Sequence, residues 1–239
     1  MAEVILALDL RDQLKALRLA ETLRQELSWV KVGLEMFTRF GPHFVETLAD
    51  MGFHIFLDLK FYDIPNTVKE SVLGCAELHV DMLTLHLQGG LRMLEYAKSA
   101  CAELAQQGKM PPKLIGVTVL TSFEKGEIPA ISLPPSVLAK ELAELAVKSG
   151  LDGLVSSVGE VALLKKSFPH LKCICPGIRP SWASRNDQRR TATPGEAACA
   201  GADWLVIGRP ILQADDPLDA TQRILAELGS FGEKTSCHN

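Results

Sequence analysis

Three ionisable side chains lie close together in the segment Asp58-Leu59-Lys60-Phe61-Tyr62-Asp63. A lysine ammonium group among carboxylates stays charged, can stabilise negative charge that develops on a substrate, and can then supply a proton. Such a group suits a reaction that leaves electron density on a carbon atom. An isolated Asp-x-Lys is more simply explained as an ordinary ion pair at a strand end, so the second aspartate is what favours a catalytic site.

The local pattern predicts where each of these groups lies. Residues 54–57 form a short apolar run, which predicts a buried strand that ends near Leu59. Because side chains alternate along a strand, Asp58 and Lys60 are expected to project from one face at its carboxyl end. Pro65 suits an early helical position and disfavours helix in the residue before it, which places Asp63 in the turn after the strand.

Apolar runs and amphipathic segments alternate along the chain. Eight runs predict buried strands: Val4–Leu8, Val30–Leu34, Ile55–Leu59, Met82–Leu87, Leu114–Leu120, Gly153–Val158, Lys172–Cys175 and Trp204–Ile207. Helical periodicity lies between them, as in Asp12–Leu27, Thr67–Leu78, Leu91–Gln106, Pro135–Ser149, Glu160–Phe168 and Pro217–Leu228. One strand and one helix take about 30 residues, so the alternation predicts an α/β fold of the (β/α)8 TIM-barrel class. A doubly wound sheet is the alternative.

Length and composition fit one domain. The chain has 239 residues, of which 47% are hydrophobic, and a single barrel is expected to take residues 1–228. Residues 229–239 are small, polar and aperiodic, so we expect a disordered tail there.

The composition also disfavours several functional classes. The net charge is −4, and no basic stretch suits a nucleic acid or an anionic membrane. The chain starts in a strand without a basic leader, and no apolar run reaches the length of a membrane span, so a cytoplasmic protein is expected. The cysteines and histidines have no metal-ligand spacing, and buried, reduced thiols are expected instead.

In a TIM barrel the active groups come from the carboxyl ends of the strands. The candidate site residues of this chain follow that rule: Asp9, Lys31, Asp58, Lys60, Thr121, Ser122, Pro176, Arg179, Gly208 and Arg209. His86 also ends a predicted strand, but a supporting or core role is the simpler interpretation. The candidate site is therefore one rim of the barrel.

The loops after the last two predicted strands favour a phosphorylated small substrate. The polar loop from Ile178 to Thr193 contains four arginines and Gln188, and by itself it could be an ordinary solvated loop. On this fold, however, the loops after the seventh and eighth strands commonly bind phosphate. Arg209, beside Gly208, could make a bidentate contact to a phosphate group. The long loop would then also act as a lid.

These positions carry a resemblance to a known family. The motifs are Ala7-Leu-Asp9, Lys31-Val-Gly, Asp58-x-Lys60-x-x-Asp63-Ile-Pro-Asn-Thr67, Thr118-Val-Leu-Thr-Ser122, Pro176-Gly-Ile-Arg179 with Gln188, and Gly208-Arg209-Pro210. Together they resemble the bacterial type of orotidine 5′-phosphate decarboxylase over positions 9–210. Asp-x-Lys-x-x-Asp alone is shared with sugar-phosphate decarboxylases of the same barrel suprafamily, so the other motifs make the resemblance specific.

The resemblance implies decarboxylation of orotidine 5′-monophosphate to uridine 5′-monophosphate, the last step of de novo pyrimidine synthesis, with neither metal nor cofactor. Lys60 would donate the proton, Asp58 would lie beside the substrate carboxylate, and Lys31 and Asp63 would complete the charge array. Asp63 and Thr67 would reach into the site of a neighbouring subunit, which implies a homodimer. The further substrate contacts implied are Asp9, Ile64, Thr121, Ser122, Pro176, Arg179, Gln188, Gly208 and Arg209.

Three alternatives remain open. A Schiff-base aldolase would need a neutral Lys60, whereas the flanking aspartates favour the ammonium form. A metal-dependent sugar-phosphate decarboxylase would be sensitive to chelators. A barrel that binds a phosphorylated ligand without catalysis would be expected to lack part of the charge array.

Overall fold

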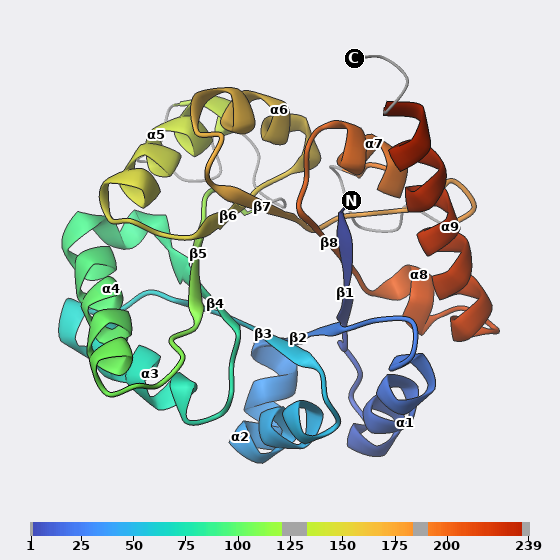
Figure 1. The fold of residues 1–239 in the computed structure, drawn as a ribbon, viewed down its shortest axis with the longest axis horizontal. Helices are drawn as coiled ribbons and strands as arrows, with labels where there is room; N and C mark the ends of the chain where they lie inside the picture. Colours follow the sequence, from blue (N-terminus) through green and yellow to red (C-terminus); the bar gives the residue numbers. More distant parts are fainter. Residues whose placement is uncertain (1, 121–132, 184–190, 236–239) are drawn as a thin grey trace.

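Eight parallel strands close into a barrel in chain order, with the helices outside it (Figure 1). The structure is a computed structural model that describes residues 2–120, 133–183 and 191–235, the last five by their backbone alone. The strands are β1 (Glu3–Ala7), β2 (Trp29–Gly33), β3 (His54–Phe61), β4 (Met82–His86), β5 (Lys113–Val117), β6 (Gly153–Val155), β7 (Lys172–Cys175) and β8 (Trp204–Ile207). The predicted (β/α)8 barrel is therefore confirmed, because the pairing of β1 with β8 closes the sheet.

The helices lie in the connections between the strands and after the last strand. They are α1 (Gln13–Leu23), α2 (Leu34–Asp50), α3 (Pro65–Ala76), α4 (Gly90–Gln106), α5 (Pro135–Lys148), α6 (Val158–Ser167), α7 (Pro194–Cys199), α8 (Arg209–Leu212) and α9 (Pro217–Thr235), with a 3-10 turn η1 (Leu87–Gly89) before α4. Local sequence signals start several of them. Asp12 caps α1, and Thr193 with Glu196 forms a capping box at α7. No described helix is both long and apolar enough to cross a membrane.

The period-2 alternation of the strands divides the core in two. On β1, Val4 and Leu6 pack outward against the helices, whereas Ile5 and Ala7 point into the barrel. The inner cluster fills the barrel interior with Ile5, Ala7, Trp29, Phe56, Met82, Ile115, Ile174, Trp204 and Val206. Trp29 and Trp204 begin β2 and β8 and meet edge to face at the amino end, with ring centroids 5.9 Å apart. The barrel is thus a packed core with its open space at the other end.

Three aspartates hold the register at the amino end of the barrel. Asp81, Asp152 and Asp203 each directly precede an even-numbered strand. Each carboxylate accepts a hydrogen bond of 2.8 Å from a backbone N–H in the preceding strand. The donors are Ile55 for Asp81, Leu114 for Asp152 and Cys173 for Asp203. Because a shift of one residue would turn every side chain to the other face, these bonds help to fix which residues line the barrel.

Several predicted boundaries were wrong. β5 ends at Val117 rather than Leu120, and β6 ends at Val155 rather than Val158. β3 continues past Leu59 to Phe61. Helix α9 runs past Leu228 to Thr235, through residues that the composition assigned to a tail. α9 packs against α1, α7 and α8, and such tertiary packing outweighs the low helix propensity of the glycine at position 229.

Candidate active site

The lysine at the centre of the candidate site lies in a bulge of β3. The pairing of β3 with β4 shifts between Leu57, opposite Leu83, and Phe61, opposite Leu85. Lys60 lies in this interval with a φ of 54°, a left-handed conformation that is uncommon for residues other than glycine. Asp58 and Lys60 lie in the carboxyl-terminal half of the strand, and the bulge sets the direction of the Lys60 side chain.

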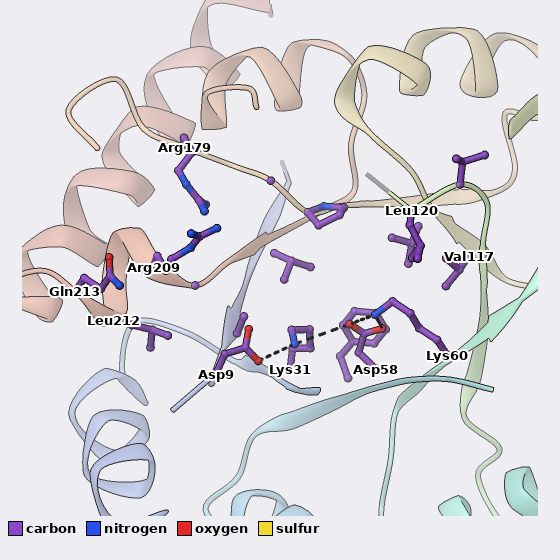
Figure 2. A pocket seen from close by; sticks show the side chains of 18 residues that line it. Asp9, Lys31, Asp58, Lys60, Val117, Leu120, Arg179, Arg209, Leu212 and Gln213 are labelled. Carbon is purple, nitrogen blue, oxygen red and sulfur yellow. Dashed lines mark hydrogen bonds and ion pairs between the residues drawn. The ribbon is translucent and has the colours of Figure 1, made fainter. Parts of the chain in front are cut away.

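Four side chains form a row of alternating charge, drawn with dashed lines in Figure 2: Asp9 follows β1, Lys31 lies on β2, and Asp58 and Lys60 lie on β3. The Lys60 Nζ donates to both carboxylate oxygens of Asp58, at 2.8 and 2.9 Å. The Lys31 Nζ lies 3.8 Å from the other side of that carboxylate and donates to Asp9 at 3.1 Å. Lys31 and Asp58 are nearly buried, with side chains 10% and 14% exposed, whereas the Lys60 side chain is 33% exposed. Lys60 is therefore the more accessible of the two lysines.

Gly33 leaves room for this row. A Cβ atom at Gly33 would lie 2.6 Å from the Lys31 Nζ and 3.3 Å from a carboxylate oxygen of Asp9. Any side chain there would push the ammonium group out of its place between the two aspartates. The glycine of the Lys31-Val-Gly motif is therefore needed for close approach.

The row also fixes the charge of Asp58. Burial raises the pKa of this carboxyl group, but the attraction of Lys31 and Lys60 and the hydrogen bonds from Lys60 and Thr84 outweigh it, so the pKa lies below its usual range. His86, at the end of β4, lies beside this row. Burial and, to a lesser extent, the charge of Lys60 lower the pKa of its imidazole ring, which favours the neutral form. Its ring lies 5.9 Å from that of Tyr62, and its Nδ1 has no hydrogen-bond partner among the described residues.

The row lines one side of a cavity of about 560 Å³ at the carboxyl rim (Figure 2). Arg179 and Arg209 point into the same cavity on the side away from Lys60. Arg209 begins α8 directly after Gly208, and Arg179 is buried and follows β7 through Gly177, whose φ is 77°. The remaining lining residues are Ala7, Phe56, Val117, Val119, Leu120, Val155, Pro176, Gly177, Val206, Gly208, Leu212 and Gln213. The cavity thus has a charged end, an apolar wall and a cationic end.

The cavity brings together most, but not all, of the expected site residues. Asp9, Lys31, Asp58, Lys60, Pro176, Arg179, Gly208 and Arg209 all line it. Asp63, Ile64 and Thr67 do not line it, and the Asp63 carboxylate instead accepts the backbone N–H of Ile64, a residue whose side chain is exposed. Thr121, Ser122 and Gln188 lie outside the described residues.

Sequence reasoning missed three contributors to this site. Thr84 of β4 is fully buried and hydrogen-bonds both Asp58 and Lys60. A threonine in a strand is ordinary, so nothing in the sequence singled it out. Leu212, the last residue of α8, and Gln213, which follows it, also line the cavity, and their closeness to the Gly208-Arg209-Pro210 motif was the available signal in the sequence.

None of the described cysteines lines the cavity, and Cys237 lies outside the described residues. Cys75, Cys101, Cys173 and Cys175 are buried as expected, and burial raises the pKa of Cys75 to about 12 and that of Cys101 to about 11. Cys199 is exposed, which corrects the expectation for that residue, because α7 is short and Cys199 is its last residue. Within the described ranges no group of three or more His, Cys, Asp or Glu side chains could hold a metal ion.

A (β/α)8 barrel with charged groups converging at the carboxyl rim belongs to the class of TIM-barrel proteins whose active sites occupy that rim. The sequence profile of the "Orotidine 5'-phosphate decarboxylase / HUMPS family" matches residues 2–224. The chain belongs to this family.

Individual relatives agree with this assignment. Proteins named orotidine 5′-phosphate decarboxylase are 50% identical in Pseudomonas syringae pv. syringae and 43% identical in Lawsonia intracellularis, each over 228 residues. These alignments cover 94% and 95% of this chain and 97% and 100% of the relatives. The crystal structure of orotidine 5′-phosphate decarboxylase from Lactobacillus acidophilus superimposes with a TM-score of 0.81 at 34% identity, over 95% of this chain and 99% of that one.

Proposed function

We propose that this chain decarboxylates orotidine 5′-monophosphate to uridine 5′-monophosphate and carbon dioxide, as the names of its relatives indicate for those proteins. The observation that carries the proposal is the row Asp9, Lys31, Asp58, Lys60, which faces a cavity whose other end holds Arg179 and Arg209. A cavity with a proton donor at one end and guanidinium groups at the other suits a phosphorylated substrate that must be protonated at carbon.

Lys60 is the proton donor in the proposed reaction. The bond between the ring carbon and the carboxylate carbon breaks, the electron pair remains on the ring carbon, and carbon dioxide leaves. The Lys60 ammonium group stabilises this negative charge and then transfers a proton to the same carbon, which gives the product. Asp58 supports this role, because its carboxylate contacts the Lys60 Nζ through both oxygens and favours the ammonium form.

Asp58 has a second proposed effect. With its pKa held below the usual range, it is a carboxylate at neutral pH, beside the place where the substrate carboxylate would lie. Repulsion between two carboxylates is relieved when carbon dioxide leaves as a neutral molecule. Asp58 therefore raises the free energy of the bound substrate but not that of the bound product.

The opposite side of the cavity binds the rest of the nucleotide. Arg209 and Arg179 would bind the phosphate group, together with the backbone at Gly208. Asp9 and Lys31, between the arginines and Lys60, would bind the ribose hydroxyl groups. Thr121 and Ser122 would contact the pyrimidine, and Gln188 the phosphate region, as the family resemblance implies.

We further propose a homodimer with shared sites. Asp63, Ile64 and Thr67 do not line the cavity of their own chain, and the side chains of Tyr62 and Ile64 on either side of Asp63 are 61% and 67% exposed. Exposed apolar side chains grouped beside a functional segment are typical of a protein interface. A second copy of this chain would cover them and receive Asp63 and Thr67 in its own cavity.

The test of the function is a decarboxylation assay with orotidine 5′-monophosphate, followed by absorbance, in the presence of excess chelator. We expect turnover that the chelator does not change, and no turnover in Lys60→Ala, which should still bind uridine 5′-monophosphate because the phosphate contacts lie elsewhere. Absence of turnover with the wild-type protein, or turnover that chelator abolishes, would overturn the proposal. The second result would favour a metal-dependent sugar-phosphate decarboxylase.

The shared site has its own test. In a heterodimer of Lys60→Ala and Asp63→Ala chains, one of the two sites receives both intact residues if Asp63 acts across the interface. Mixing the two inactive variants should therefore restore part of the activity. If heterodimers form and no activity returns, Asp63 acts in its own chain.

The proposed reaction belongs to pyrimidine nucleotide synthesis, for which we expect a cytoplasmic location.

A further inference from the structure

The conformation of Lys60 requires a restraint. A lysine with a φ of 54° is strained, because its Cβ atom crowds the backbone in a way that glycine avoids. Such conformations persist only where the surroundings hold them, and they cluster at functional sites. The bulge interrupts the ladder between β3 and β4 at this point, so regular strand pairing does not supply the restraint.

A single hydroxyl group opposite the bulge supplies it. Thr84 lies on β4 between Leu83 and Leu85, the two residues at which the pairing with β3 shifts. Its side chain is fully buried. The Thr84 Oγ1 accepts the backbone N–H of Lys60 at 2.8 Å and donates to the Asp58 Oδ1 at 3.1 Å.

The two hydrogen bonds of Thr84 determine each other's direction. A hydroxyl group has one proton and two lone pairs, so accepting from Lys60 leaves its proton for the ionised carboxylate of Asp58. Asp58 in turn accepts the Nζ of Lys60 through both oxygens. The backbone nitrogen and the side-chain nitrogen of Lys60 are therefore both tied to one carboxylate, one through Thr84 and the other directly.

We propose that Thr84 is a positioning residue for catalysis: its buried hydroxyl holds Lys60 in the left-handed conformation and aims the ammonium group at the reacting carbon. This inference rests on the proposed decarboxylation. Without the hydroxyl, Lys60 relaxes toward the ordinary strand conformation and its Nζ moves relative to the substrate, while the phosphate and ribose contacts on the other side of the cavity stay in place. Loss of Thr84 therefore lowers kcat more than it changes KM.

The test compares Thr84→Val, which keeps the shape and removes the hydroxyl, with Thr84→Ser, which keeps the hydroxyl. Thr221→Val is the matched control, since Thr221 is also fully buried but donates to the Pro217 carbonyl on α9, away from the cavity. We expect kcat to fall on the order of 100-fold in Thr84→Val, the scale of a misplacement of about 1 Å. KM for orotidine 5′-monophosphate and the affinity for uridine 5′-monophosphate stay near wild type, and Thr84→Ser and Thr221→Val keep most of the activity.

A second measurement does not depend on the reaction. Hydrogen exchange of the peptide that contains Lys60 should be faster in Thr84→Val than in wild type or Thr84→Ser, because the Lys60 N–H loses its acceptor. If Thr84→Val does not fold, Thr84→Ala provides the same contrast with Thr84→Ser.

The outcomes separate the two proposals. Wild-type kcat in Thr84→Val, beside an inactive Lys60→Ala, overturns the role of Thr84 and leaves the proposed function intact. Equal loss of activity in Thr84→Ser and Thr84→Val also overturns it, since the hydroxyl would then not matter. Unchanged exchange shows that Thr84 does not hold the bulge. A wild-type protein that does not decarboxylate orotidine 5′-monophosphate overturns the function, and the catalytic role of Thr84 with it.

Discussion

Gly33→Ala is the sharpest test of the charge row, because it adds one methyl group and removes no charge. The new Cβ would lie 2.6 Å from the Lys31 Nζ, and an ordinary contact needs about 3.5 Å, so the ammonium group must move by about 0.9 Å. The Lys31 side chain is only 10% exposed and lies between Asp9 and Asp58, so it has little space in which to move. Its distances to the two carboxylates should therefore lengthen.

The cost follows from these distances. At an effective dielectric constant of about 20, lengthening the 3.1 Å contact to Asp9 and the 3.8 Å contact to Asp58 by about 0.9 Å weakens each by roughly 1 kcal/mol. Asp9 is 49% exposed, so solvent screens part of its share. We expect a loss of about 1–2 kcal/mol in transition-state stabilisation, which is about a 5- to 30-fold decrease in kcat/KM.

Folding stability should change less than activity in this variant. Gly33 has φ −91° and ψ 177°, which alanine adopts without backbone strain, so a gain of about 0.4–1 kcal/mol through the unfolded state offsets part of the cost of the weakened ion pairs. Gly159→Ala on α6 is the matched control, because its Cβ would meet nothing within 4 Å. The assays are kcat/KM for orotidine 5′-monophosphate and the thermal midpoint. Wild-type kcat/KM in a folded Gly33→Ala protein would refute the reasoning, since Lys31 would then have room to withdraw.

Three further predictions concern other parts of the molecule. Arg209→Ala should weaken binding of uridine 5′-monophosphate by about tenfold or more, since a charge-assisted hydrogen bond is worth about 1.5–3 kcal/mol. Calorimetry should find no loss of affinity for uridine, which has no phosphate group. An equal loss of affinity for both ligands would show that Arg209 does not bind the phosphate group. Asp203→Asn should lower the free energy of unfolding at pH 7 by about 1–3 kcal/mol. Burial raises the pKa of Asp203, but hydrogen bonds from Lys165, the Cys173 backbone and Lys172 lower it overall, so its stabilisation exists above the unfolded pKa of about 3.9 and is lost as pH falls through the folded pKa. The stabilities of the wild-type and Asp203→Asn proteins should therefore begin to converge as pH falls below about 4 and become equal only below the folded pKa of Asp203, and a difference that does not shrink over this range contradicts the electrostatic explanation. His86 should titrate below its usual range in an NMR experiment, because burial and Lys60 both oppose its charged form, and a midpoint at or above about 6.5 contradicts this.

Periodicity was enough to predict the barrel and the rim on which the site lies. The strands β4 and β8, for example, coincide with apolar runs of ordinary length. Asp58 and Lys60 come directly after another such run, so the pattern alone predicted that both charges lie at the carboxyl end of a strand. The motifs from Asp9 to Arg209 then indicated the family, and the cavity gathers most of the residues that they contain.

The bulge at Lys60 could not be predicted in this way. Strict alternation places Asp58 and Lys60 on one face of a strand that ends at Leu59, whereas the chain gains extra residues against β4 and turns Lys60 into a left-handed conformation. Glycine or asparagine usually marks such a position, and neither is present here. The restraint comes from Thr84, which is distant in sequence and has no unusual signature of its own.

The closed amino end of the barrel has a kinetic consequence. Trp29 and Trp204 and the apolar side chains above them fill the interior beneath the cavity, so the cavity opens only toward the carboxyl rim in the part of the chain that the structure describes. Substrate and both products then share one entrance. Carbon dioxide formed at the bottom must pass the nucleotide or wait for it to leave, and uridine 5′-monophosphate should behave as a competitive inhibitor that occupies the same route as the incoming substrate.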